Sequence, residues 1–310
     1  MTDQARKPRL SIVVVVYKMP DQAERTLYSL SSAYQQGIDA QDYEIIVVEN
    51  QSDQVLGEER ATRHASNLRY FLRHETQRTP VHAINFGVEQ ARAEQVAIVI
   101  DGARMVTPGT VRQTLAAFRL DPEAAVSVPG YHLGRELQQV AVNSGYNEAI
   151  EAELMAAIGW PQDGYRLFEI AVFSASFRAG FFGANHESNF LATSLRKWRQ
   201  IGAMDPRYDD FGGGMANLDL YKRLLEAPDT PLYLLYAEGS FHQFHGGVTT
   251  GTPKQERDNI MKQILKQDVE IRGPRRGAPQ ARPILFGAPH PGVYRFIRQS
   301  LDVVHGTEIA

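Results

Sequence analysis

The stretch Leu10–Tyr17, LSIVVVVY, decides the fold class. It is a continuous run of apolar and β-branched residues, which is typical of a strand buried on both faces of a parallel sheet. Similar runs occur at residues 43–48 (YEIIVV), 68–72 and 96–100 (VAIVI), and helical periodicity separates them. Strands that alternate with helices in this way form parallel sheets covered by helices on both faces. The sequence therefore predicts a three-layer, Rossmann-like α/β/α fold with a mostly parallel central sheet.

The second half of the chain is less regular. We expect helices over residues 191–201, 217–225 and 255–271, and an insertion that reaches about residue 189. From Gly273 the composition shifts to Pro, Gly and Arg, which predicts an extended arm before a last short helix near residues 293–304.

Composition excludes several classes of protein. The 310 residues carry a formal net charge of -3, so there is no overall basic field to attract nucleic acid. There is no cysteine, which excludes disulfides and thiolate chemistry. No apolar run approaches the ~20 residues that a membrane span requires, nor is there an export signal. We therefore expect a cytoplasmic protein without a transmembrane segment, with peripheral membrane contact still possible.

Polar residues follow Val16, Val48 and Ile100, where three of the predicted strands end. The carboxyl ends of parallel strands meet at one edge of a sheet, and ligands bind there. These residues should therefore line a single crevice.

Five segments together resemble family 2 glycosyltransferases of the GT-A fold. They include residues 11–30, 43–53 and 83–109 (AINFGVEQARAEQVAIVIDGARMVTPG), and later GAMDPRYDDFGGGMANLDLYKR and SFHQFHGG. The GGG-x-x-NLD and FHQ-x-HGG patterns suggest a bacterial subset of that family. The resemblance covers roughly residues 9–250. It implies a flexible tail (1–8), one GT-A domain (9–272, with a nucleotide-sugar-binding half at 9–128 and an acceptor-side half at 129–272) and a C-terminal arm with a short helix (273–310).

The activity that this resemblance implies is transfer of a sugar from a UDP- or GDP-sugar to a hydroxyl acceptor. The acceptor would be a glycan or another hydroxyl compound, in bacterial polysaccharide or glycan assembly; a homo-oligomer is possible. The donor would contact Val15, Tyr17, Glu49, Asn50, Asn85, Gly87, Asp101, Gly102 and Arg104. Asn50 replaces an aspartate of the family, which leaves uridine and guanosine open, and residues 49–53 could also be only a turn.

The resemblance also implies a divalent cation on the diphosphate. The family's D-x-D pair is reduced here to Asp101, because its partner position holds Ala103. His242 and His245 are candidates to complete a Mn²⁺ or Mg²⁺ site. Alternatively, Arg104 neutralises the diphosphate directly and the metal is dispensable.

The family's catalytic acid pair is replaced as well, by Ala216 and Asn217. If the enzyme inverts, its general base must be Asp219, Asp209, Asp210 or Glu187, of which we favour Asp219. Asn217 and Asp219 also resemble the x-N-x-[DE] pattern of retaining enzymes, or could simply begin a helix. We expect Glu187, Tyr208, Asp209 and Asp210 on the acceptor side.

Other activities fit the sequence less well. A nucleotidyltransferase would need a glycine-rich loop after the first strand, and a dinucleotide-dependent dehydrogenase a G-x-G-x-x-G motif; neither is present. The remaining alternative is a catalytically degenerate nucleotide-sugar-binding or scaffold protein of the same fold.

Overall fold

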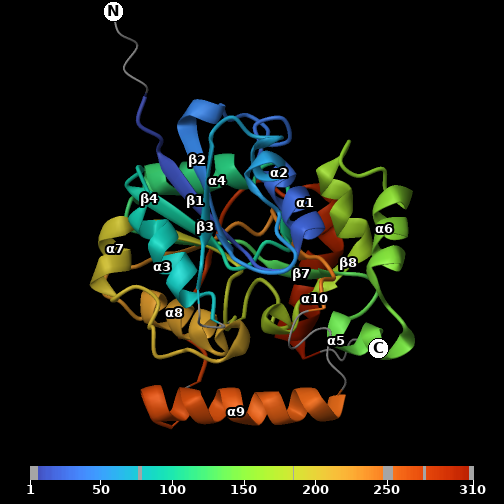
Figure 1. Ribbon diagram of the computed structural model, residues 1–310. Helices are drawn as coiled ribbons and strands as arrows, with labels where there is room; N and C mark the ends of the chain where they lie inside the picture. Colours follow the sequence, from blue (N-terminus) through green and yellow to red (C-terminus); the bar gives the residue numbers. More distant parts are fainter. Residues whose placement is uncertain (1–5, 76–78, 184, 247–253, 275–276, 307–310) are drawn as a thin grey trace, which may run out of the picture.

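The computed structural model describes residues 6–75, 79–183, 185–246, 254–274 and 277–306. Its central sheet has the strand order β12-β10-β6-β9-β4-β1-β2-β3 (Figure 1). These strands are β1 (Leu10–Val16), β2 (Tyr43–Asn50), β3 (Leu68–Arg73), β4 (Gln95–Val99), β6 (Ala125–Ser127), β9 (Phe190–Ser194), β10 (Leu232–Leu234) and β12 (Ile284–Leu285).

The central sheet is mostly parallel, as the sequence predicts. β1 pairs in parallel with β2 and β4, and its side chains alternate between two apolar layers. One layer contains α1 (Pro20–Leu30), α2 (Glu58–Thr62) and α4 (Thr110–Leu120); the other contains α3 (Val81–Glu89), α7 (Leu195–Gln200) and α8 (Ala216–Leu225). Burial on both faces explains the unbroken apolar run of LSIVVVV.

One local prediction is wrong in part. Residues 191–194 form part of the antiparallel strand β9, between β4 and β6, and the helix begins only at Leu195. Backbone pairing with two neighbouring strands overrides the helical pattern there. At α1, the N-cap is Met19, and the carboxylates of Asp21 and Glu24 pair with Arg60 of α2.

A second sheet, with the order β5-β11-β7-β8, was not predicted. Its strands are β5 (Arg104–Val106), β7 (Gly130–Leu133), β8 (Ala171–Phe173) and β11 (Ser240–His242). Tyr131 is fully buried at its centre and stacks between Phe173 and Phe241. The helices α5 (Gln138–Ala141) and α6 (Glu148–Ala157) lie on this side of the molecule (Figure 1).

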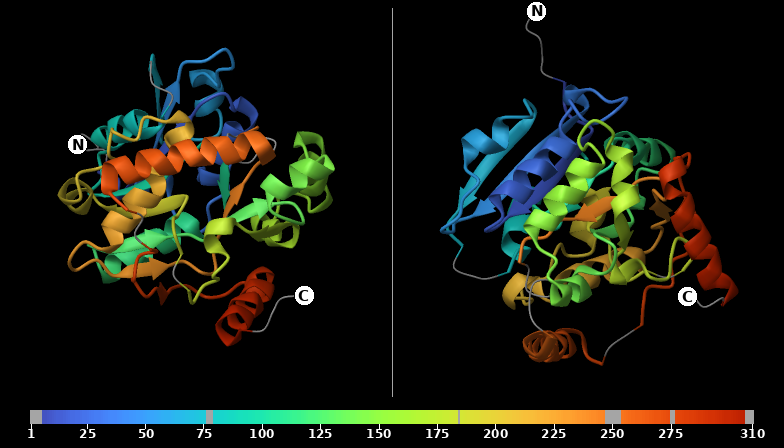
Figure 2. Two further views of the ribbon diagram at one scale, coloured as in Figure 1. Left: turned by 90° about the horizontal axis from the view of Figure 1, so that it is seen from below. Right: turned by 90° about the vertical axis from the view of Figure 1, so that its right-hand side faces the viewer.

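The helix α9 (Lys254–Arg272) crosses the molecule in front in the left view of Figure 2. Ile264 packs near Gly214, and Arg272 forms ion pairs with Asp205 and Asp219. Beyond it, β12 joins the edge of the central sheet, and Phe296 of α10 (Tyr294–His305) packs on Tyr131. Among the described helices, none is both long and apolar enough for a membrane crossing.

Candidate functional site

The site begins where β4 ends. Asp101 follows this strand, and three residues later the chain enters β5 at Arg104. In the second sheet, His242 of β11 lies opposite Arg104 on one side and opposite His132 of β7 on the other. Strand pairing therefore brings the carboxyl end of β4 and the loop after β11 to the same place.

Asp101 is held by its own turn. Its Oδ1 accepts from the Ala103 backbone N–H at 2.9 Å, and its Oδ2 accepts from Arg104 Nε at 3.1 Å. Desolvation raises the pKa of Asp101, but the neighbouring Arg104 and His245 and the Ala103 hydrogen bond outweigh it and hold that pKa below its usual range. The side chain is thus an ionised carboxylate at neutral pH.

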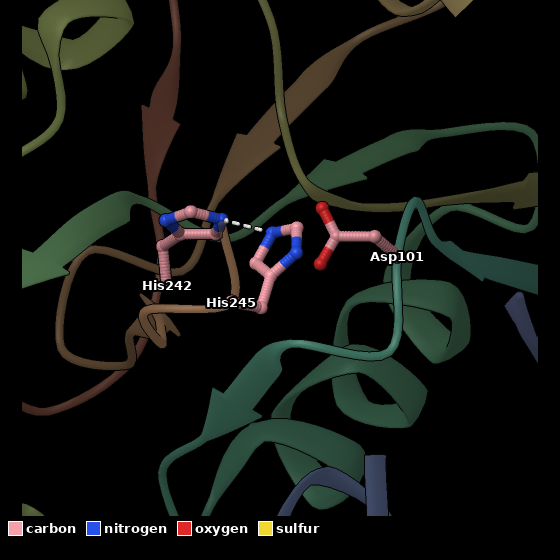
Figure 3. Close-up of side chains that lie close together, drawn as sticks. All are labelled: Asp101, His242 and His245. Carbon is pink, nitrogen blue, oxygen red and sulfur yellow. Dashed lines mark hydrogen bonds between the residues drawn. The ribbon is translucent and has the colours of Figure 1, made fainter. Parts of the chain in front are cut away.

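Two histidines lie beside this carboxylate. His242 Nε2 is 3.1 Å from His245 Nε2, and in Figure 3 the His245 ring lies between His242 and Asp101. Burial lowers the pKa of His242 well below its ordinary value, with Arg104, His245 and His132 adding to the effect. Burial also lowers the pKa of His245, although Asp101 opposes this shift. Both imidazoles are neutral at pH 7, the form that binds metal ions.

The three side chains fit a divalent cation. One ligand atom from each of Asp101, His242 and His245 lies within 4.8 Å of the other two. Two nitrogens bound at about 2.0–2.1 Å to one ion are roughly 3 Å apart, close to the separation of the two Nε2 atoms. Two imidazoles and one carboxylate make Mg²⁺ the poorer fit, because it prefers oxygen ligands.

The loop after β11 is fixed by helices from both halves of the chain. Gln243 Nε2 donates to Gln22 O and to Thr26 Oγ1 of α1, each at 3.0 Å. Arg25 Nε donates to Gln243 Oε1, and the buried Glu151 of α6 accepts from the Phe244 N–H at 2.8 Å. These contacts restrict the position of His245.

The residues expected to bind the nucleotide differ in exposure and in whether their polar atoms already have partners. Asn50 ends β2 with 7% of its surface exposed, and within the described chain its Oδ1 is buried without a hydrogen-bond partner. Tyr17 is exposed, whereas Val15 is buried in the core. Glu49 is fully buried, and its carboxylate accepts from Leu56 N, Gly57 N and Tyr70 Oη. The Glu49 carboxylate therefore fixes the position of the chain at Leu56 and Gly57, beyond the end of β2.

Asn85, Gly87 and Gly102 have packing roles in the structure. The Asn85 side chain bonds both the N–H and the C=O of Met204. A Cβ on Gly87 would lie 2.5 Å from Val13 Cγ1, and one on Gly102 would lie 3.1 Å from Ala23 Cβ. Both glycines therefore allow helices to approach β1 and the turn after β4 closely.

Among the residues predicted for catalysis and the acceptor side, the structure joins Asn217 and Glu187. Asn217 Nδ2 donates to Glu187 Oε2 at 2.8 Å and to Ser188 O at 3.3 Å. The Ile100 N–H donates to Asn189 O, so residues 187–189 run beside the end of β4 where Asp101 follows. Glu187 and Asn217 therefore share this edge of the sheet with Asp101.

A family model described as glycosyl transferase family 2 matches residues 11–184, more than half of the sequence. The chain belongs to glycosyl transferase family 2. A search of curated proteins finds no match.

Solved structures share the family's GT-A fold. Staphylococcus aureus TarS residues 1–349 align with a TM-score of 0.53 at 12% identity, covering 96% of this chain and 72% of that one. The same fragment in complex with UDP-GlcNAc gives a TM-score of 0.52 at 12% identity, covering 96% and 73%. Against the longer TarS structure, the alignment covers 43% of that chain.

In this family 2 chain, four of the predicted acceptor-side or catalytic residues contact α9 or its neighbours. Asp219 accepts from Arg223 Nε and Arg272 Nε, each at 2.7 Å. Tyr208 is fully buried and donates to Asp268, while Asp209 and Asp210 accept from Gln267 and Gln263. Both carboxylate oxygens of Asp219 are occupied by the guanidinium groups of Arg223 and Arg272, so the contacts disfavour it as the base.

The sequence prediction omitted several residues around the metal cluster. They are His132, Gln138 and Glu151, which are all buried. A lone histidine or glutamine has no motif to reveal it. Only the pairing of β7 with β11 brings His132 and Gln138 to the site.

Proposed function

We propose that this protein transfers a sugar from a nucleoside-diphosphate sugar to a hydroxyl acceptor. The observation that carries the proposal is the cluster of Asp101, His242 and His245 beside Arg104, directly after β4 of a family 2 chain. Solved TarS structures of similar fold contain UDP or UDP-GlcNAc, which supports a uridine nucleotide as the first donor to test. The base contacts we propose are Asn50, Val15 and Tyr17, and guanosine remains the alternative.

We propose that Asp101, His242 and His245 hold Mn²⁺ in preference to Mg²⁺. A bound cation at this position would supply positive charge for the departing diphosphate. Arg104 would act on the same charge, since its Nη1 is a buried donor without a partner among the described residues. In the metal-independent alternative, Arg104 alone has this role.

For the acceptor we propose Glu187 as the general base. Its carboxylate is oriented by Asn217, and of the four candidate acids it is the one beside the strand end that carries Asp101. In this scheme Glu187 accepts the proton of the attacking hydroxyl, which makes the oxygen a better nucleophile toward the anomeric carbon. If the enzyme instead retains configuration, the leaving phosphate takes this proton and Glu187 only positions the acceptor.

The test has two stages. Thermal-shift assays with UDP and GDP, each with Mn²⁺, Mg²⁺ or EDTA, identify the nucleotide and the metal requirement. Hydrolysis and transfer assays with the matching nucleotide-sugars then measure turnover. We expect stabilisation by one nucleotide with Mn²⁺ and slow sugar release that EDTA abolishes. Equal turnover in EDTA and Mn²⁺ would exclude the metal role.

A second candidate is a binding protein that does not catalyse transfer, which Ala103 and Asn217 favour because both replace acidic residues of the family. It predicts stabilisation by a nucleotide with no release of sugar. We propose bacterial polysaccharide or glycan assembly in the cytoplasm as the setting, on the basis of the family resemblance and the composition.

A further inference from the structure

We propose that Gln138 is a positioning residue that fixes the tautomer of His242, so that Nε2 of this ring directs its lone pair toward His245. The inference rests on the proposed metal-supported function. Gln138 is fully buried and begins the short helix α5, outside the predicted motifs.

The orientation of the Gln138 amide follows from its neighbours. Its Nε2 donates to His242 O at 3.0 Å and lies 3.4 Å from Glu151 Oε2 and 3.5 Å from Leu133 O. All three are acceptors, so a flipped amide would direct its oxygen at three other oxygens. The amide nitrogen must face this side, and Oε1 must face His242.

This orientation determines where the proton of His242 lies. Gln138 Oε1 is 2.5 Å from His242 Nδ1, and an amide oxygen can only accept. Nδ1 therefore carries the hydrogen, and in the neutral ring Nε2 has the lone pair. Nε2 is the nitrogen that lies 3.1 Å from His245 Nε2, on the side of Asp101.

Glu151 helps to hold the Gln138 amide in this orientation. It is buried, and its Oε2 accepts from Tyr146 Oη at 3.1 Å and from Phe244 N at 2.8 Å, in addition to facing Gln138. One carboxylate thus anchors both the amide and the loop that carries His245. A glutamate at position 138 would bring a second carboxylate against Glu151, so the neutral amide suits this place.

The same residue also contacts the third histidine. The Gln138 backbone N–H donates to His132 Nδ1 at 3.1 Å, so in that ring the acceptor is Nδ1 and the proton lies on Nε2. His132 and His242 consequently have opposite tautomers, although they lie opposite each other in neighbouring strands. These opposite tautomers can be observed directly, and side-chain packing without the Gln138 hydrogen bonds would not produce them.

The first experiment uses the unaltered, metal-free protein. Long-range ¹H–¹⁵N NMR of the histidine rings identifies the protonated nitrogen, and His242→Asn and His132→Asn assign the two signals. We expect Nδ1–H for His242 and Nε2–H for His132. An Nε2–H tautomer for His242 overturns the proposal, whatever the activity of the protein.

The second experiment compares Gln138→Leu with Gln139→Leu. The control removes the same amide one residue later, where the hydrogen bonds within the described chain go to the backbone oxygen, from Arg257 and Asn143. Partners that orient a metal ligand typically contribute 10–100-fold to metal affinity. We expect Q138L to weaken Mn²⁺ binding, followed by electron paramagnetic resonance of free Mn²⁺, by about that factor, and Q139L to leave it unchanged.

The outcomes separate this inference from the proposed function. If Q138L binds Mn²⁺ as tightly as the unaltered protein, the positioning role is wrong while the metal site stands. If the unaltered protein binds no Mn²⁺, the metal-supported function fails, and the tautomer measurement still decides what Gln138 does. If Q138L does not fold, that measurement also remains decisive.

Discussion

His242 of β11 lies directly opposite Arg104 of β5, although these residues come from distant parts of the sequence. Asp101 precedes β5 and His245 follows β11, so this pairing joins two otherwise separate loops into one cluster. The second sheet therefore acts as the frame of the candidate metal site.

Asp101→Asn should remove the one carboxylate of the metal cluster while leaving the fold intact. We expect weaker Mn²⁺ binding and a fall in kcat of about 10²–10³-fold, the usual effect of removing one group that stabilises developing charge. Mn²⁺ titration and turnover of the nucleotide-sugar measure these effects. Asp258→Asn on the exposed surface of α9 is the control. Full activity in D101N would contradict the assignment.

Glu187→Gln should lower turnover without lowering stability, whereas Asp219→Asn should lower stability with little direct effect on turnover. E187Q keeps the hydrogen-bonding shape but cannot accept a proton, so kcat should fall by about 10²–10⁴-fold at an unchanged melting temperature. D219N weakens the ion pairs with Arg223 and Arg272 and should lower the melting temperature with little direct effect on turnover. If D219N alone abolishes turnover in a stable protein, our choice of base is wrong.

Gly87→Ala should destabilise the fold even though alanine favours helices. The new Cβ would lie 2.5 Å from Val13 Cγ1 and 3.1 Å from Val48 Cγ2, which are both buried β-branched side chains. Overpacking of this kind costs about 1–3 kcal/mol, more than the helical propensity returns. Denaturant unfolding measures the change. Gly277→Ala, where a Cβ meets nothing within 4 Å, should be nearly neutral.

Glu238→Gln should change how stability depends on pH. Burial raises the pKa of Glu238 from 4.5 to about 7, against hydrogen bonds from Thr107 and Tyr165. Because the folded state then binds more protons than the unfolded state, this group's contribution is present below pH 4.5 and is lost as the pH rises through about 7.

Glutamine does not ionise, so the E238Q variant does not lose stability in this way as the pH rises. The stability of E238Q relative to the unaltered protein should therefore rise by on the order of 3 kcal/mol between pH 4.5 and pH values above 7. Urea unfolding of both proteins across this range gives the difference. A difference that does not change with pH would mean that Glu238 is not buried as a neutral acid.

Much of the fold could be predicted from the sequence, because a strand that is buried on both faces is a continuous run of apolar residues. The run at Leu10–Val16 and its repeats gave the parallel strands and the edge where Asp101 lies. The helix predicted over residues 191–201 is correct for Leu195–Gln200, but residues 191–194 belong to a strand, since a short apolar segment fits both periods and only its neighbours β4 and β6 decide.

The α/β architecture, the family resemblance and the residue types of the site can be predicted from the amino-acid sequence, because they depend on local periodicity and motifs. Tertiary structure alone decided which side chains meet: that Asn217 contacts Glu187, that Asp219 is bound by two arginines, and that Gln138 faces His242. Such contacts depend on strand register and helix packing between distant segments. No local pattern records them.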